Sequence, residues 1–247
     1  MVSSAQARDT LPLHRCHDAQ CIAQAVQPGR HTAVANMNLV FDFGAVLFAW
    51  KPAELLAHRF PDRAGTPDAA RHLAHAVFGH ADWHSFDRGV LAMDELVSRT
   101  SERLTLDAPV LSELVAGIGE QLLPIPGTLA ILQHVHSQRS QSPGLRLYYL
   151  SNMPVPYART LEQRHAFLQW FDGGLFSGDV LHIKPNPEIY RLLQDRFLLE
   201  PSQTVFIDDL LANVQAAQAL GWHGIHFESP EQLQQQLADM NIYKKAV

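Results

Sequence analysis

Residues 39–50 read LVFDFGAVLFAW, an apolar run that is interrupted by a single carboxylate, Asp42. Valine and phenylalanine favour β-strands, and a strand that is apolar on both faces is typical of a parallel sheet covered by helices. We therefore predict a buried strand over residues 38–43. Reactive side chains in open α/β sheets gather at the carboxyl ends of the strands. Asp42 is thus the first candidate functional residue.

The chain after Pro126 continues in the same style. Strand-like apolar runs occur at residues 145–150, 175–176, 204–207 and 224–227, and helical patterns occur at residues 128–138, 157–169, 188–197 and 211–220. A last helix begins at Ser229-Pro230-Glu231-Gln232, which has the pattern of a capping box. Strands that alternate with helices predict an α/β core with a doubly wound (Rossmann-like) parallel sheet.

Residues 53–123 have no strand pattern and are helical in character. Thr66-Pro67 places a capping residue before a proline at the first helical position, and residues 93–104 and 108–123 have amphipathic periodicity. We therefore predict an all-helical cap of residues 53–123. It would be inserted into a core made of residues 37–52 and 124–247.

The composition sets broad limits on function. The 247 residues are 47% apolar and 18% charged, which is ordinary for a globular protein, and the formal charge of −6 provides no basic footprint for nucleic acid. No uninterrupted apolar stretch approaches the roughly 18 residues of a transmembrane helix. Only two cysteines occur, so a disulfide scaffold is excluded and a cytoplasmic location is expected. We expect residues 1–36, mostly small and polar, to be a disordered leader.

Polar residues also follow the later predicted strands. Ser151-Asn152 and Asp208-Asp209 stand at strand ends, and Lys184 precedes a proline between them. Together with Asp42 these groups suit phosphoryl transfer. A carboxylate can attack phosphorus, while a hydroxyl, an amide and an amine can bind the phosphoryl oxygens and balance their charge. Carboxylates from two strand ends can also hold Mg²⁺.

Four segments in chain order, FDFGAVLF, YYLSN, IKPNPEIY and FIDDLLAN, resemble the four motifs of the haloacid dehalogenase-like (HAD) hydrolase superfamily. The resemblance spans residues 38–227, and the helical segment resembles the C1 cap of that family. It implies a Mg²⁺-dependent phosphatase that forms an aspartyl-phosphate. The implied site has Asp42 as nucleophile; Ser151, Asn152 and Lys184 as phosphate-binding residues; Asp42, the Gly44 carbonyl and Asp209 as metal ligands; Asp208 as support for the metal's water shell; and Asn213 as an orienting residue.

Gly44 departs from the pattern of most phosphatases in this family, which have a second Asp two residues after the nucleophile as general acid and base. The Asp-x-Gly sequence resembles that of sugar-phosphate phosphatases of the α-glucose-1-phosphate phosphatase kind, so a sugar phosphate is the expected substrate. Two alternatives are a metal-independent 2-haloacid dehalogenase and a relic that only binds phosphometabolites. The acidic pair Asp208-Asp209 argues against the dehalogenase, which usually has serine there.

Some other residues have two interpretations. The sets His14, Cys16, His17, Cys21 and His72, His75, His80, His84 suggest metal ligands, but the first has no standard spacing and the second is typical of solvated helix faces. Trp83, Phe86 and Arg88-Gly89 either pack between cap helices or line the cleft. We expect a small phosphorylated metabolite as the partner, no nucleic acid or membrane, and a monomer or homodimer.

Overall fold

The computed structural model describes residues 36–243. They contain a five-stranded sheet with the order β3-β2-β1-β4-β5, in which all neighbouring strands are parallel. The strands are β1 (Met37–Phe41), β2 (Leu145–Ser151), β3 (Gly173–Phe176), β4 (Thr204–Asp208) and β5 (His223–His226). This confirms the predicted doubly wound α/β fold. The predicted leader lies, except for Asn36, outside the described residues.

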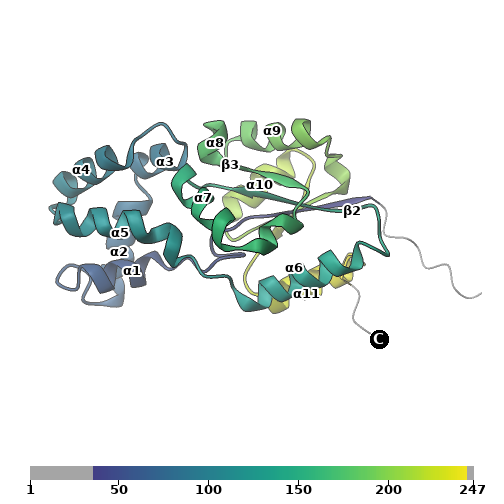
Figure 1. The fold of residues 1–247 in the computed structure, drawn as a ribbon, viewed down its shortest axis with the longest axis horizontal. Coiled ribbons are helices and arrows are strands. Elements are labelled where there is room, and N and C mark those ends of the chain that lie inside the picture. The colour runs from purple at the N-terminus through teal and green to yellow at the C-terminus, as the bar shows by residue number, and fades with distance from the viewer. Residues whose placement is uncertain (1–35, 244–247) are drawn as a thin grey trace, which may run out of the picture. The chain divides into compact units, whose positions relative to one another are not determined.

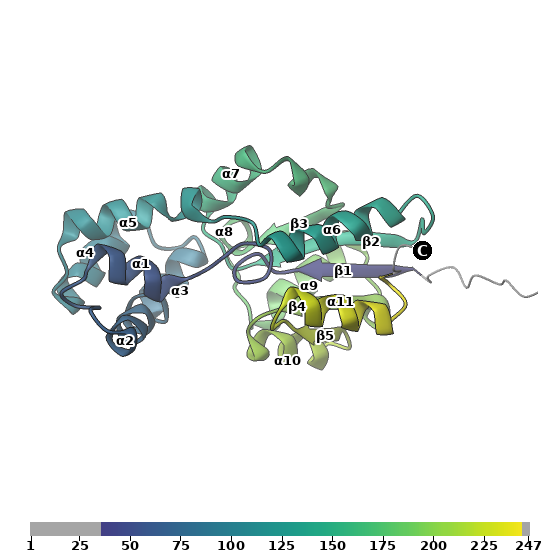
Figure 2. The ribbon, with the colours of Figure 1, turned by 90° about the horizontal axis from the view of Figure 1, so that it is seen from below.

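Helices cover both faces of the sheet (Figures 1 and 2). The side chains of Leu39 and Phe41 in β1 point into a core shared with α6 (Pro126–Gln138), α7 (Val155–Arg164) and α11 (Pro230–Asp239). Val40 points into a second core, shared with α9 (Pro187–Phe197) and α10 (Leu211–Ala219). All three β1 side chains are fully buried. The apolar character of residues 39–41 therefore follows from burial on both faces.

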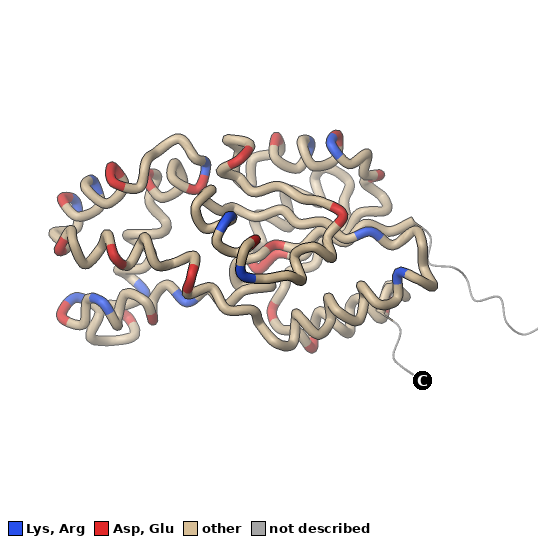
Figure 3. Tube along the Cα trace, in the orientation of Figure 1, with Lys and Arg blue, Asp and Glu red and all other residues tan. Residues whose placement is uncertain are grey.

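The cap consists of helices, as predicted. They are α1 (Pro52–Arg59), α2 (Pro67–Phe78), α3 (Ala81–Asp87), α4 (Met93–Leu104) and α5 (Ala108–Gln121). Thr66 caps α2 by accepting a hydrogen bond from the Ala69 amide at 3.2 Å. Figure 3 shows acidic and basic residues intermixed along these helices. The exact division of the chain into cap and core stays a prediction.

The chain enters and leaves the cap through two connections that are hydrogen-bonded to each other. The Ala49 amide donates to the Leu123 carbonyl and the Ile125 amide donates to the Leu47 carbonyl, both at 2.8 Å. Phe48 and Pro124 form an antiparallel bridge between them. We call residues 47–49 and 123–125 the paired linker. It fixes both ends of the cap at the carboxyl end of β1.

One predicted helix is wrong in its bounds. The pattern at residues 157–169 predicts one continuous helix, but α7 ends at Arg164 and a 3₁₀ turn follows at Ala166–Trp170. Aromatic packing explains the end of the helix, because the turn lets the Phe167 ring stack on that of the buried Phe48, with the ring centroids 5.8 Å apart. Two short elements, α8 (Ser177–Val180) and a 3₁₀ turn at Pro201–Gln203, were not predicted. No described helix is both long enough and apolar enough to cross a bilayer.

Candidate active site

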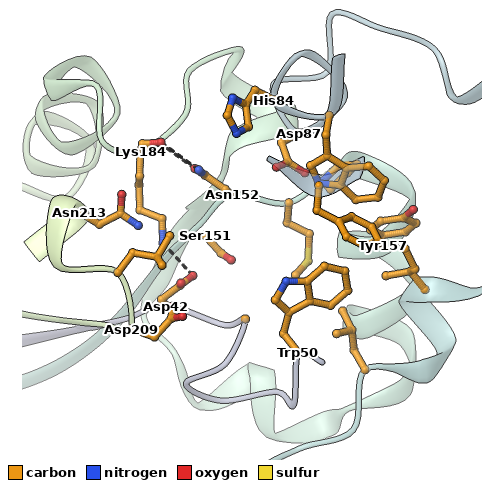
Figure 4. A pocket seen from close by; sticks show the side chains of 18 residues that line it. Asp42, Trp50, His84, Asp87, Ser151, Asn152, Tyr157, Lys184, Asp209 and Asn213 are labelled. Atoms are coloured by element: carbon orange, nitrogen blue, oxygen red, sulfur yellow. Dashed lines mark hydrogen bonds and ion pairs between the residues drawn. The ribbon is translucent and has the colours of Figure 1, made fainter. Parts of the chain in front are cut away.

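The carboxyl ends of β1, β2 and β4 meet at one edge of the sheet, because these strands are parallel neighbours. A pocket of about 260 Å³ opens there between the strand ends and the cap (Figure 4). Its core wall contains seven of the eight predicted site residues: Asp42, Gly44, Ser151, Asn152, Lys184, Asp209 and Asn213. Asp208, the eighth, lies behind this wall and is fully buried. The structure therefore brings all eight residues together.

Lys184 is the only described cation in direct contact with the strand-end carboxylates. Its Nζ lies 2.8 Å from Asp42 Oδ1 and 2.7 Å from Asp208 Oδ2, and its side chain is 1% exposed. Burial alone would lower the pKa of Lys184, but Asp208 and Asp42 more than offset that effect and raise it. Lys184 therefore stays charged. It can balance one negative charge on the nucleophile and can face the phosphoryl group.

Asp208 has contacts that differ from the role implied by the resemblance. Its carboxylate accepts hydrogen bonds from the Leu210 amide at 2.8 Å and from Asn213 Nδ2 at 2.9 and 3.1 Å, in addition to the Lys184 ion pair. Both carboxylate oxygens are thus engaged by the protein. Asp208 holds Lys184 and Asn213 in place. Asn213 donates to Asp208, and its orienting role stays a prediction.

Asn152 also acts on Lys184. Its Nδ2 donates to the Lys184 carbonyl at 3.0 Å and its Oδ1 accepts from the Lys184 amide at 2.8 Å. The side-chain amide therefore pairs with the backbone of Lys184, so the predicted phosphate contact of Asn152 would have to come from its backbone N–H. The buried Ser151 hydroxyl lines the pocket and has no hydrogen-bond partner among the described residues. Such a hydroxyl is suited to a phosphoryl oxygen.

Three carboxylates at this edge form a candidate metal site. One oxygen each from Asp42, Asp208 and Asp209 lies within 4.8 Å of the others. Burial, opposed by Lys184, raises the pKa of Asp42 to about 7, and burial with the nearby Asp208 raises that of Asp209 to about 6. One lysine cannot balance three carboxylates, so the site is short of positive charge. A hard divalent cation fits an all-oxygen site of this kind. The ligand set of Asp42, Asp209 and the Gly44 carbonyl stays a prediction.

The cap contributes a different wall. Three aromatic side chains line the pocket here: Trp50, Phe78 and Trp83. The rings of Phe78 and Trp83 pack edge to face, with their centroids 4.5 Å apart. Both interpretations hold for Trp83, which lines the cleft and also packs against Phe86 inside the cap, with the ring centroids 5.6 Å apart. Phe86 in addition contacts Tyr157 of the core helix α7, with the ring centroids 5.8 Å apart. A Cβ on Gly44, on the core wall, would meet no atom within 4 Å, so steric crowding does not explain this glycine.

Sequence reasoning missed three residues at or beside the site (Asp87, His226 and Ser177), and it considered a fourth, His84, only as one of a set of metal ligands. Asp87 and His84 of α3 line the pocket from the cap side. His226, directly at the end of β5, contacts the Asp209 carbonyl at 2.9 Å, and Ser177, directly after β3, accepts from the Met153 amide at 2.8 Å. Ser177 directly follows the strand predicted at residues 175–176, so reading that strand end would have found it. His226 lies inside the strand predicted at residues 224–227, because β5 ends one residue earlier than predicted.

The suggested histidine metal site does not form. The acidic trio is the only group of three or more potential metal ligands in residues 36–243. His80 instead accepts from the Asp82 amide at 3.1 Å and caps α3. The set His14, Cys16, His17 and Cys21 lies outside the described residues.

Comparisons with known proteins found chains of similar sequence and structures of similar fold. A sesquiterpene phosphatase of Aspergillus oryzae is 26% identical over 187 residues, which are 76% of this chain and 87% of that protein. A HAD family enzyme of Bacteroides thetaiotaomicron, solved with magnesium and inorganic phosphate, has a TM-score of 0.59 at 19% identity, covering 78% of this chain and 94% of that chain. An L-2-haloacid dehalogenase of Xanthobacter autotrophicus has a TM-score of 0.57 at 20% identity, covering 82% of each chain.

These two solved structures share the fold with this protein, and at such identities they establish no more than the fold. The match to a family is broader. The model of the haloacid dehalogenase-like hydrolases matches residues 39–221, which include all four motifs and the cap. The chain therefore belongs to the haloacid dehalogenase-like hydrolase family.

Proposed function

We propose that this hydrolase is a Mg²⁺-dependent phosphatase that cleaves a small phosphomonoester through an aspartyl-phosphate on Asp42. The observation that carries the proposal is the grouping of Asp42, Lys184 and Asp209 in one pocket, with the unpartnered Ser151 hydroxyl beside them. In the bound state Mg²⁺ would screen the repulsion between an anionic nucleophile and an anionic substrate. The pocket volume of about 260 Å³ suits a small molecule.

The chain's own residues support each part of this reaction. The Lys184 ammonium at 2.8 Å favours the ionised form of Asp42, which is the form that can attack phosphorus. Ser151, Lys184 and the Asn152 backbone N–H can bind the phosphoryl oxygens that carry the developing charge. The Asn152 side chain fixes the Lys184 backbone, so the amine is held before substrate arrives.

The carboxylates also bear on the dehalogenase alternative. Asp208 and Asp209 lie close to Asp42, and the pKa values of Asp42 and Asp209 are raised by burial. Asp208 already pairs with Lys184, so the argument concerns Asp209. Uncompensated buried charge is costly, so a metal-independent enzyme gains nothing from Asp209. A site that binds a divalent cation does gain from it. We therefore favour the phosphatase.

Turnover of 4-nitrophenyl phosphate tests the proposal. Wild-type protein should be active with Mg²⁺, inactive in EDTA and active again after Mg²⁺ is returned. Asp42→Asn should abolish turnover, and Asp209→Asn should raise the Mg²⁺ concentration needed for half-maximal rate by tenfold or more, since a charged ligand is lost. Asp179→Asn, outside the pocket, is the matched control. Halide release from 2-haloacids in EDTA, without phosphatase activity, would reject the proposal in favour of a dehalogenase.

The organic group of the substrate is a separate matter. The sequence predicted a sugar phosphate, but the cap wall of Trp50, Phe78 and Trp83 is apolar and aromatic. Such a wall stabilises an apolar group by burying its surface. The similar protein named as a sesquiterpene phosphatase supports the same direction. We therefore propose the phosphate ester of an apolar alcohol as a second candidate beside the sugar phosphate.

Two primary alkyl esters separate these candidates, because their leaving groups are chemically alike. Burying roughly 100 Å² of apolar surface is worth about 2.5 kcal/mol. We therefore expect kcat/KM for 3-phenylpropyl phosphate to exceed that for glucose 6-phosphate by about tenfold or more. The reverse order would favour the sugar phosphate and leave the phosphatase assignment intact.

A further inference from the structure

The proposed reaction needs a proton donor that the core wall does not supply. When the phosphorus–oxygen bond of an alkyl ester breaks, the departing oxygen needs a proton. Asp42 is the nucleophile, and Lys184 is held between two carboxylates. Asp209 is a proposed metal ligand. The Tyr157 hydroxyl is also engaged, because it donates to the Val115 carbonyl at 2.6 Å. Among the titratable side chains that line the pocket, only His84 and Asp87 are left, and both lie on α3.

Asp87 lies on the cap wall, and Figure 4 shows it across the pocket from Asp42 and Lys184. In an in-line displacement the leaving oxygen departs on the side of phosphorus opposite to the nucleophile. A phosphoryl group bound between Ser151 and Lys184 would thus direct its leaving oxygen away from Asp42, toward the cap. The geometry places a carboxyl group where that oxygen emerges.

The position of Asp87 is fixed by contacts on both sides. Its carbonyl accepts a hydrogen bond of 2.5 Å from Ser177 Oγ, the same hydroxyl that accepts from the Met153 amide. Phe86, one residue before it, is buried against Tyr157. Gly89 approaches the core so closely that a Cβ there would lie 2.7 Å from the Gly178 carbonyl oxygen. Asp87 is therefore held by the core although it belongs to the cap.

The surroundings of Asp87 favour its protonated form. Among residues 36–243 its carboxyl group makes no hydrogen bond or ion pair, neither with the adjacent Arg88 nor with His84 one turn earlier. Burial raises the pKa of Asp87 well above its usual value; Lys184 opposes this and Asp42 adds to it. The carboxyl group also stands at the last residue of α3, where the free carbonyls disfavour a negative charge. A neutral carboxyl group can donate a proton.

We propose that Asp87 is a catalytic residue that protonates the leaving oxygen and later activates water, an inference that rests on the proposed phosphatase function. In the first step Asp42 Oδ forms a bond to phosphorus, the ester phosphorus–oxygen bond breaks, and the leaving oxygen takes that electron pair and the Asp87 proton. In the second step water attacks phosphorus and returns a proton to Asp87. The bond from phosphorus to Asp42 then breaks, and its electron pair stays on Asp42. The products are one alcohol and one hydrogen phosphate.

Two esters that differ in leaving group test this role in the full-length protein. The phenolate of 4-nitrophenyl phosphate can leave without being protonated, whereas the alkoxide of 3-phenylpropyl phosphate needs a proton in order to leave. Asp87→Asn should lower kcat/KM for the alkyl ester by about 10²–10⁴ and for the aryl ester by less than tenfold. With the aryl ester it should also release a burst of one nitrophenol per site, because the second step is slowed and the phosphorylated enzyme accumulates.

Control variants separate this role from folding and from His84. Asp82→Asn is on the same helix and removes a carboxylate that contacts Arg99 outside the pocket, so it should leave both rates unchanged. Equal loss for both esters in Asp87→Asn, without a burst, would overturn the role and show a positioning effect only. The selective loss in His84→Asn instead would assign the proton transfer to His84. A wild type that hydrolyses neither ester would overturn the proposed function together with this role.

Discussion

Replacing Lys184 with Met removes the buried cation that links Asp42 and Asp208. At an effective dielectric constant of about 20, two charges 2.7 Å apart attract by about 6 kcal/mol, so the two ion pairs represent about 12 kcal/mol of gross attraction. Most of this is offset, because methionine avoids the several kcal/mol needed to bury an ammonium group. Breaking such a buried pair from one side costs about 3–5 kcal/mol. We expect that loss in the free energy of unfolding.

The assay is urea unfolding followed by circular dichroism, in EDTA, at pH 8 and pH 5. Lys184 lowers the pKa of Asp42, so without it the folded-state pKa of Asp42 rises further. A carboxyl group whose pKa is raised by folding contributes stability at low pH, and that contribution is lost as the pH rises through the folded-state value. The deficit of Lys184→Met should therefore be larger at pH 8 than at pH 5.

Lys51→Met is the matched control. Lys51 makes an ion pair with Glu54 at 3.0 Å, but the two side chains are 62% and 70% exposed. Solvent screens such pairs, so the control should lose at most about 1 kcal/mol. A loss of this size for Lys184→Met, or a loss that does not change with pH, would refute the reasoning that Lys184 is held by two buried carboxylates.

Two further predictions concern stability. Burial and Asp208 raise the pKa of Asp209 to about 6. The Tm of the metal-free wild type should therefore fall as the pH rises from about 4 through about 6, and the Tm of Asp209→Asn should fall less. Parallel curves of Tm against pH for the two proteins would contradict this. Gly89 has φ +79° and faces the Gly178 carbonyl, so Gly89→Ala should cost roughly 1–3 kcal/mol in denaturant unfolding. Gly117→Ala in α5 is the control, because an added Cβ there would meet only the flexible end of the Gln121 side chain. It should leave the free energy of unfolding unchanged or raise it by about 0.5–1 kcal/mol. Equal effects of the two substitutions would show that the cap–core contact is loose.

The core side of the site was predictable because of one topological rule. Asp42, Ser151 and Asp208 follow or end strands β1, β2 and β4, and parallel neighbours bring their carboxyl ends to the same edge. The rule places residues but does not assign their contacts. Asn152 and Asp208 were expected to act on phosphate and on the metal's water shell, and those roles stay predictions. What the sequence did not predict is that their side chains also engage the Lys184 backbone and ammonium. Such pairings depend on side-chain geometry at the 1 Å scale.

The cap side was not predictable in the same way. Helix periodicity located α4 and α5, but it gives only the face of a helix that is buried, not the part of the core that this face meets. Asp87 follows an aromatic residue at the end of a seven-residue helix, and no local pattern distinguishes it from a surface acid. Its place at the pocket comes from the contacts of Ser177 and Gly178 with the chain around it.

The paired linker has a consequence for how this protein can change over evolution. The chain departs from β1 and returns toward α6 through residues 47–49 and 123–125, which are hydrogen-bonded to each other. Any insert whose two ends lie side by side can join these positions without disturbing the sheet. The segment between them can be exchanged as a unit. Such an exchange alters the apolar wall and Asp87 together, while Asp42 and Lys184 stay in the core. Selectivity and leaving-group chemistry would then be inherited as one piece, separate from the nucleophile.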